Sequence, residues 1–95
     1  MTDNDRPLKT ETPGPLVIEL ETHSEKLVFS FFQKGADEAS HECLRRSTVH
    51  IADLETFASK HIRSQDVTVL EASTNSSSIA ERMERIGLRA YVVNS

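Results

Sequence analysis

Val67-Thr68-Val69-Leu70-Glu71-Ala72-Ser73-Thr74-Asn75 is the stretch on which the predicted fold depends. Three β-branched residues and a leucine form a short apolar run, which is typical of a buried strand. The run ends in Glu71, and small polar residues lead into a helical pattern. In open α/β sheets, ligands bind at the carboxyl ends of the strands, so Glu71 lies where a metal ligand or proton-transfer group is expected. The alternative is a solvated carboxylate beside a helix N-terminus, with no further role.

The bulk composition indicates one small domain or a part of a larger one. Residues 1–15 hold all three prolines and are predicted to form a disordered lead, so the domain is expected to span 16–95. The net charge of −4 argues weakly against nonspecific binding of nucleic acid. The single cysteine, Cys43, excludes an internal disulfide and fits the reducing cytoplasm. No apolar run has the length of a membrane span, so we expect a cytoplasmic protein without membrane contact.

The first half of the domain is predicted to form three strands. Strands over 16–21 and 26–33 are joined by a short turn at 22–25, which makes them an antiparallel hairpin. A weaker third strand is predicted over 41–46, and its flanking charges favour an edge position.

Two helical patterns follow. The first is predicted to begin after a cap at Ser47 or Thr48 and to bury apolar residues that recur at helical spacing up to Ile62. The second is predicted over 76–86, where Ser78 and Glu81 have the spacing of a capping box. Gly87 follows at the position that favours a left-handed terminating residue.

Strands over 66–72 and 88–93 flank the second helix, which gives the order β-β-β-α-β-α-β. This is an α/β fold with the order of a ribonuclease H-like mixed sheet, truncated after its fifth strand. In such a sheet the first and fourth strands are neighbours, so Glu19 or Glu21 is expected near Glu71. Carboxylates a few ångströms apart repel one another unless a cation lies between them, which favours a Mg²⁺ or Mn²⁺ site.

The other polar residues are expected to be structural. The four histidines are predicted to lie at the surface or in turns. Three arginines, Arg82, Arg85 and Arg89, could contact a phosphate backbone, but the interspersed Glu81 and Glu84 favour a salt-bridged helix face.

The glutamate strand and the last strand together resemble the N-terminal domain of IS110-type transposases. In that family a strand with Leu-Glu-Ala-(Ser/Thr)-Gly-Asn precedes a helix, as in residues 70–75, and a Gly-x-x-Val-x-Val-Val-Asn-Pro strand follows, as in residues 87–95. Leu20-Glu21-Thr22-His23 is similar to the family's Ile-Asp-Val-His. The resemblance covers residues 16–95.

This resemblance implies a ribonuclease H-like fold with an Asp-Glu-Asp-Asp set of acids that bind divalent metal, Mg²⁺ or Mn²⁺, and cut DNA. It implies that Glu71 is the second catalytic acid and that Glu21 stands in place of the first aspartate, with Glu19 as the register alternative. It also implies DNA and a structured guide RNA as partners of the full-length family, and DNA transposition as the function.

The chain departs from the family at several positions. Glutamate replaces the first aspartate, which moves the carboxylate by about one methylene group. Thr74 replaces a glycine, and Ser95 replaces a proline. The two later aspartates and the family's C-terminal domain, which carries a serine, are expected beyond residue 95. We therefore expect a truncated transposase that is inactive alone.

Two other function classes compete with this interpretation. One is a small noncatalytic interaction domain that forms a homo-oligomer through an exposed sheet edge. The other is a nucleotide-binding or receiver-like protein, against which the predicted antiparallel strands argue.

Overall fold

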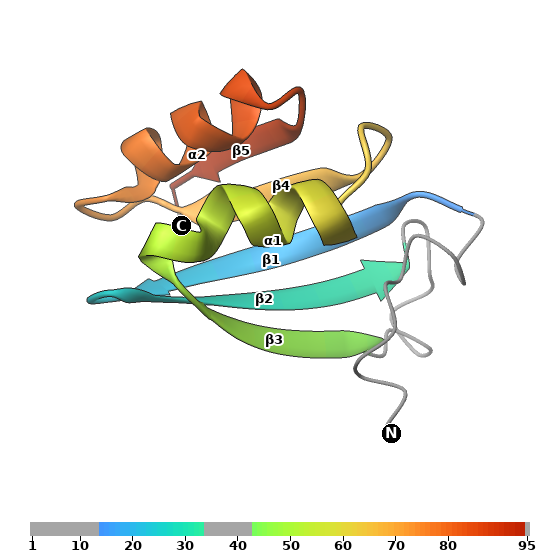
Figure 1. Ribbon diagram of the computed structural model, residues 1–95, viewed down its shortest axis with the longest axis horizontal. Coiled ribbons are helices and arrows are strands. Elements are labelled where there is room, and N and C mark those ends of the chain that lie inside the picture. Colours follow the sequence, from blue (N-terminus) through green and yellow to red (C-terminus); the bar gives the residue numbers. More distant parts are fainter. Residues whose placement is uncertain (1–13, 34–42, 95) are drawn as a thin grey trace.

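The computed structural model describes residues 14–33 and 43–94, which form one mixed sheet and two helices (Figure 1). In chain order the elements are β1 (Leu16–His23), β2 (Lys26–Gln33), β3 (Arg45–His50), the short 3₁₀ helix η4 (Ile51–Asp53), α1 (Leu54–His61), β4 (Val67–Glu71), α2 (Ser76–Arg85) and β5 (Arg89–Val93). Of the predicted disordered lead, 1–15, all but Gly14 and Pro15 lies outside the described residues.

The sheet has the strand order β3-β2-β1-β4-β5, which confirms the predicted ribonuclease H-like arrangement. β1 pairs antiparallel with β2, and β2 pairs antiparallel with β3. β1 pairs parallel with β4, and β4 pairs parallel with β5. The hairpin between β1 and β2 is tighter than predicted, because Thr22 and His23 belong to β1 and the turn contains just Ser24 and Glu25.

Both helices cover the same face of the sheet. The connections β3-α1-β4 and β4-α2-β5 step in the same direction across the sheet, and right-handed crossovers then place both helices on one side. A single cluster of buried apolar side chains joins this sheet face to the two helices. Its members are Leu16, Ile18, Leu20, Leu27, Phe29, Phe31, Val49, Leu54, Ala58, Ile62, Leu70, Ile79, Ala80, Met83, Leu88 and Ala90.

The opposite sheet face, called here the open face, is not covered by α1 or α2. Because side chains alternate along a strand, burial of Ile18 and Leu20 against the helices turns Glu19 and Glu21 to the open face. The same alternation in β4 turns Glu71 to the open face. The predicted common face of Glu19 and Glu21 is therefore confirmed.

Helix α2 ends as the sequence predicts. Gly87 has a φ of +86°, its N–H donates to the Glu84 carbonyl at 3.0 Å, and the Leu88 N–H donates to the Met83 carbonyl at 3.1 Å. These two bonds form a Schellman motif, in which a left-handed glycine reverses the chain after the last helical turn. The motif directs Leu88 into the core and starts β5. Ile86, the last residue of the predicted helix, is the C-cap residue of α2 and is 37% exposed.

The predicted third strand and the cap of the first helix are wrong in position. β3 runs from Arg45 to His50, so Ser47 and Thr48 are strand residues, and His41 of the predicted strand lies outside the described residues. β-branched Thr48 and Val49 suit a strand, and pairing with β2 extends it. The helical segment then begins at η4, where the His50 Nδ1 accepts a hydrogen bond from the Ala52 N–H at 3.0 Å.

The predicted capping box of the second helix is also wrong. α2 begins at Ser76, so Ser78 lies inside its first turn, and Asn75 is the N-cap residue without a side-chain bond. The turn before the helix is held by Ser76, whose Oγ accepts from the Ser73 N–H and donates to the Ser73 carbonyl, each at 3.0 Å. Among the described residues, neither helix has the length and apolar character needed to cross a bilayer.

Candidate functional site

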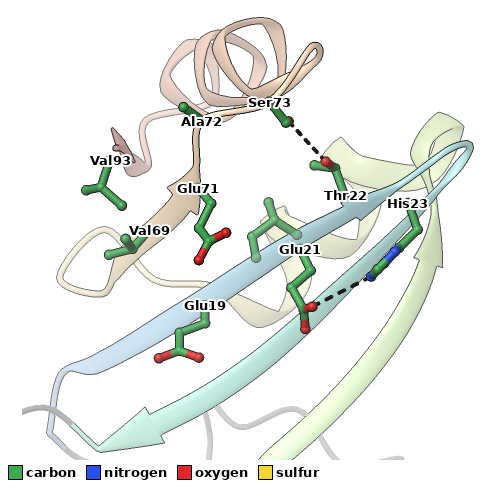
Figure 2. Close-up of a pocket in the computed structure, with 10 residues that line it drawn as sticks. Glu19, Glu21, Thr22, His23, Val69, Glu71, Ala72, Ser73 and Val93 are labelled. Atoms are coloured by element: carbon green, nitrogen blue, oxygen red, sulfur yellow. Dashed lines mark hydrogen bonds and ion pairs between the residues drawn. The ribbon is translucent and has the colours of Figure 1, made fainter. Parts of the chain in front are cut away.

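The acids that the sequence singles out lie at the carboxyl ends of two neighbouring parallel strands, β1 and β4. They line a hollow of about 490 Å³ on the open face. Its lining residues are Glu19, Leu20, Glu21, Thr22, His23, Val69, Glu71, Ala72, Ser73 and Val93. Figure 2 shows the Glu19, Glu21 and Glu71 side chains on the same side of the two strands.

The strand register explains why the acids meet. Leu20 of β1 is paired with Leu70 of β4, and both leucines are buried on the helix side. The next residue in each strand is a glutamate, so Glu21 and Glu71 occupy adjacent positions that face the opposite way. Glu19 lies two residues before Glu21 on the same face of β1, and it is paired with Val69 of β4. The predicted closeness of the β1 acids to Glu71 is therefore observed.

Glu21 has an additional neighbour, His23. Their side chains face the same way on β1, and the His23 Nε2 lies 3.7 Å from the Glu21 Oε2. Both side chains are more than 60% exposed, so the pairing is weak when the imidazole is charged. The sequence pattern predicts a turn at 22–25, which would contain His23. The sequence does contain a signal for the position of His23. Glu19, Glu21 and His23 stand at every second residue, so a strand that continues to residue 23 places all three on one face.

The rim of the hollow is closed by a hydroxyl pair that the sequence pattern does not predict. The Thr22 Oγ1 and the Ser73 Oγ are 3.1 Å apart, and they join the end of β1 to the loop between β4 and α2. Ser73 is in turn held by Ser76 at the start of α2. This chain of contacts fixes the loop that follows Glu71 against the strand that carries Glu21 (Figure 2).

The chemistry of the donors fits a hard divalent cation, but their number does not complete a site. Carboxylate oxygens are the ligands that Mg²⁺ and Mn²⁺ prefer. Within 14–33 and 43–94, however, no three His, Cys, Asp or Glu side chains are grouped closely enough to hold a metal ion. Mg²⁺ is often held by one or two carboxylates, with water and substrate phosphate completing the shell. Glu21 and Glu71 are the two residues that would supply the carboxylates of such a site.

Two other charged groups are structural. The buried Asp66 accepts from the Leu16 N–H and the Arg63 N–H, each at 2.8 Å, and forms an ion pair with the Arg63 guanidinium at 2.9 Å. Arg63 also donates to the Gly14 carbonyl. Asp66 therefore ties the start of β1 to the connection before β4, a role that its predicted position at the first residue of a strand did not suggest.

The second structural group joins the helices. Arg82 of α2 donates to both Glu55 carboxylate oxygens, at 2.6 and 2.5 Å, and to the Ile51 carbonyl at 3.0 Å. The hydrogen bonds from Arg82 lower the pKa of Glu55 from 4.5 to about 2, and those same bonds raise the pKa of Arg82. Arg85 pairs with Glu81 at 2.8 Å. The predicted salt-bridged face is thus present, although Arg82 reaches across to α1.

One histidine differs from its predicted surface position. His61 is 6% exposed, and its Nδ1 lies 3.0 Å from the Arg45 Nη1. Its ring also stacks near Phe57, with centroids 4.6 Å apart. Because Arg45 is always a donor, His61 accepts through Nδ1 and acts as a packed core side chain.

Comparison with known proteins gives one similar solved structure. No protein-family model matches the chain, and no curated protein matches it. A crystal structure of the Ppx/GppA phosphatase of Aquifex aeolicus, the type II variant, is similar with a TM-score of 0.48 and 10% identity. The match covers 84% of this chain and 36% of that one, so the chain spans little more than a third of the phosphatase. The likeness concerns the backbone path alone.

Proposed function

We propose that this chain is the N-terminal, ribonuclease H-like part of an IS110-type transposase, and that Glu21 and Glu71 are two acids of its divalent-metal site. The parent function would be DNA transposition by metal-dependent cleavage and strand transfer, guided by RNA. The observation that carries the proposal is the placement of Glu21 and Glu71 side by side at the carboxyl ends of β1 and β4. The sequence motif around each acid, and the strand order, support the same family.

The roles of the residues follow from their positions. Glu21 and Glu71 would each supply a carboxylate oxygen to Mg²⁺ or Mn²⁺. Glu19, two residues before Glu21 on the same face of β1, is the alternative ligand. A bound metal would activate the attacking oxygen and stabilise the leaving oxygen of the DNA backbone. His23 would orient the Glu21 carboxylate, from which it is 3.7 Å distant. The Thr22–Ser73 contact would hold the two strand ends at a constant separation.

The proposal is tested by a Mn²⁺ titration of the purified chain, followed by NMR. We expect paramagnetic broadening centred on the ends of β1 and β4. Glu71→Gln and Glu21→Gln remove one charged ligand each, and both variants are expected to lose the broadening. Glu84→Gln, at an exposed acid on α2 away from the hollow, is the matched control and is expected to keep it. Broadening spread evenly over the surface acids, or unchanged in Glu71→Gln, would contradict the assignment.

A further inference from the structure

Most of the exposed large apolar side chains of the described residues gather at one edge of the sheet. The described residues expose five large apolar side chains, and four of them belong to β5 or to the turn before it: Ile86, Tyr91, Val92 and Val93. β5 is an edge strand, as is β3. β3 carries two arginines and a histidine, which discourage pairing with another strand. β5 has a single charge, Arg89, at its beginning, and it contains no proline.

The outer edge of β5 carries main-chain N–H and C=O groups that can form hydrogen bonds with a further strand. The Ala72 N–H donates to the Val93 carbonyl at 2.8 Å, so the main-chain groups of Val93 face β4. Because these groups alternate in direction along a strand, those of Ala90 and Val92 point away from the sheet. They form a row of donors and acceptors along the outer edge of β5.

We propose that β5 pairs antiparallel with β5 of a second copy of this chain, with the two-fold axis at Tyr91. Ala90 then lies opposite Val92 of the partner subunit, and their outward main-chain groups exchange hydrogen bonds. Tyr91 lies opposite its own counterpart in a non-hydrogen-bonded pair, where side chains come closest. The two five-stranded sheets become one continuous sheet.

Charge complementarity selects a second copy as the occupant. Arg89, Tyr91 and Val93 share the open face, because they alternate with the buried Ala90. In the proposed register Arg89 lies opposite Val93 of the partner subunit, and Val93 is paired with Glu71 in its own sheet. Arg89 is therefore two strand spacings, about 10 Å, from Glu71 of the partner subunit, a distance that these two long side chains can bridge. Because of the two-fold symmetry, the dimer contains two such Arg89–Glu71 pairs.

The proposal needs no cation, and it is tested without metal because Glu71 serves both the Arg89 pair and the proposed metal site. The paired area is small, so we expect a weak dimer that forms at high protein concentration. Sedimentation velocity on the 95-residue chain, without metal and from about 10 µM to about 1 mM, is the first measurement. A monomer throughout this range would overturn the proposal.

Two variants test the edge. Val92→Pro removes an outward N–H and keeps the bonds between β5 and β4, so the dimer is expected to weaken at least about tenfold. Leu44→Ser, which removes an exposed apolar side chain outside β5, is the control and is expected to leave the dimer unchanged. A dimer undiminished in Val92→Pro would place the contact elsewhere. NMR dispersion verifies that each variant is folded.

Further variants test the register, and they serve if Val92→Pro does not fold. In a Cys43→Ser background, Tyr91→Cys is expected to form an intermolecular disulfide under mild oxidation, because a non-hydrogen-bonded pair has suitable geometry. Val93→Cys in the same background is expected to link poorly with itself. Arg89→Glu places two carboxylates together and is expected to weaken the dimer, and adding Glu71→Arg is expected to restore it. Equal linking at both cysteine positions would overturn the register.

Discussion

At the residue scale, the buried Asp66 side chain joins two parts of the chain that are distant in sequence. Its carboxylate is fully buried and satisfies main-chain donors of Leu16 and Arg63, while pairing with the Arg63 guanidinium. Asparagine has one acceptor oxygen and a donor NH₂, so it cannot serve both N–H groups, and it removes the negative charge that pairs with the Arg63 guanidinium. We expect Asp66→Asn to lower the free energy of unfolding by about 3 kcal/mol, measured by urea denaturation.

Asp53→Asn is the matched control for this prediction. Asp53 is exposed and makes no side-chain bond at the start of α1, so the expected change is within about 0.5 kcal/mol. Equal denaturation midpoints for the Asp66 and Asp53 variants would refute a structural role for the buried carboxylate.

Glu55 supplies a pH-dependent contribution at the same scale. Its folded-state pKa is about 2, below the ordinary 4.5, because Arg82 donates to it. The stabilisation is therefore fully present above pH 4.5 and is lost as the pH falls toward 2. Since Glu55 is 41% exposed, solvent screening limits the effect to about 1 kcal/mol.

Comparison of the parent chain with Glu55→Gln measures this contribution. We expect the parent to be the more stable at neutral pH and the difference to disappear during acid titration. Thermal unfolding at a series of pH values gives the result. A difference that stays constant from pH 7 to pH 2 would show that Glu55 acts through packing and not through its charge.

At the element scale, the end of α2 depends on one residue. An added Cβ at Gly87 meets no atom within 4 Å, so the cost of a side chain there comes from the φ of +86° alone. We expect Gly87→Ala to destabilise the chain by about 1–2 kcal/mol, as is usual for L-residues in left-handed backbone. Gly87→Asn is expected to cost less, because asparagine tolerates this conformation. Equal melting temperatures for Ala and Asn would be inconsistent with backbone strain as the cause.

At the scale of the whole molecule, the described residues bring together two neighbouring acids where the family resemblance implies four. Two carboxylates provide part of a metal shell and leave most coordination positions to water. We expect residues 1–95 alone to show no Mg²⁺- or Mn²⁺-dependent cleavage of DNA, measured on a supercoiled plasmid. Cleavage that disappears in Glu71→Gln and persists in Glu84→Gln would contradict this expectation.

Much of the architecture was predictable from local pattern. The period-two alternation of Leu16 to Glu21 determines which face carries the acids, and the apolar run before Glu71 predicts a buried parallel strand. Gly87 after an apolar helical stripe predicts the end of α2. These features depend on residues near one another in the chain, so the sequence contains them directly.

The candidate site was predictable in part for the same reason. Glu21 and Glu71 come together because each follows a leucine that must be buried, and the strand order makes their strands neighbours. His23 and the Thr22–Ser73 contact were missed because β1 continues two residues beyond its apolar pattern. That extension is stabilised by pairing with β2, which the sequence of β1 does not show.

By itself, then, the sequence was sufficient for the fold class, the strand order and the common face of the acids, because alternation and burial are local constraints. The position of β3, the start of α1 and the role of Asp66 depend on partners distant in the chain. Asp66 accepts from Leu16, 50 residues away, and β3 takes its bounds from its register with β2. Such contacts exist only after packing has brought the elements together, so tertiary structure alone determines them.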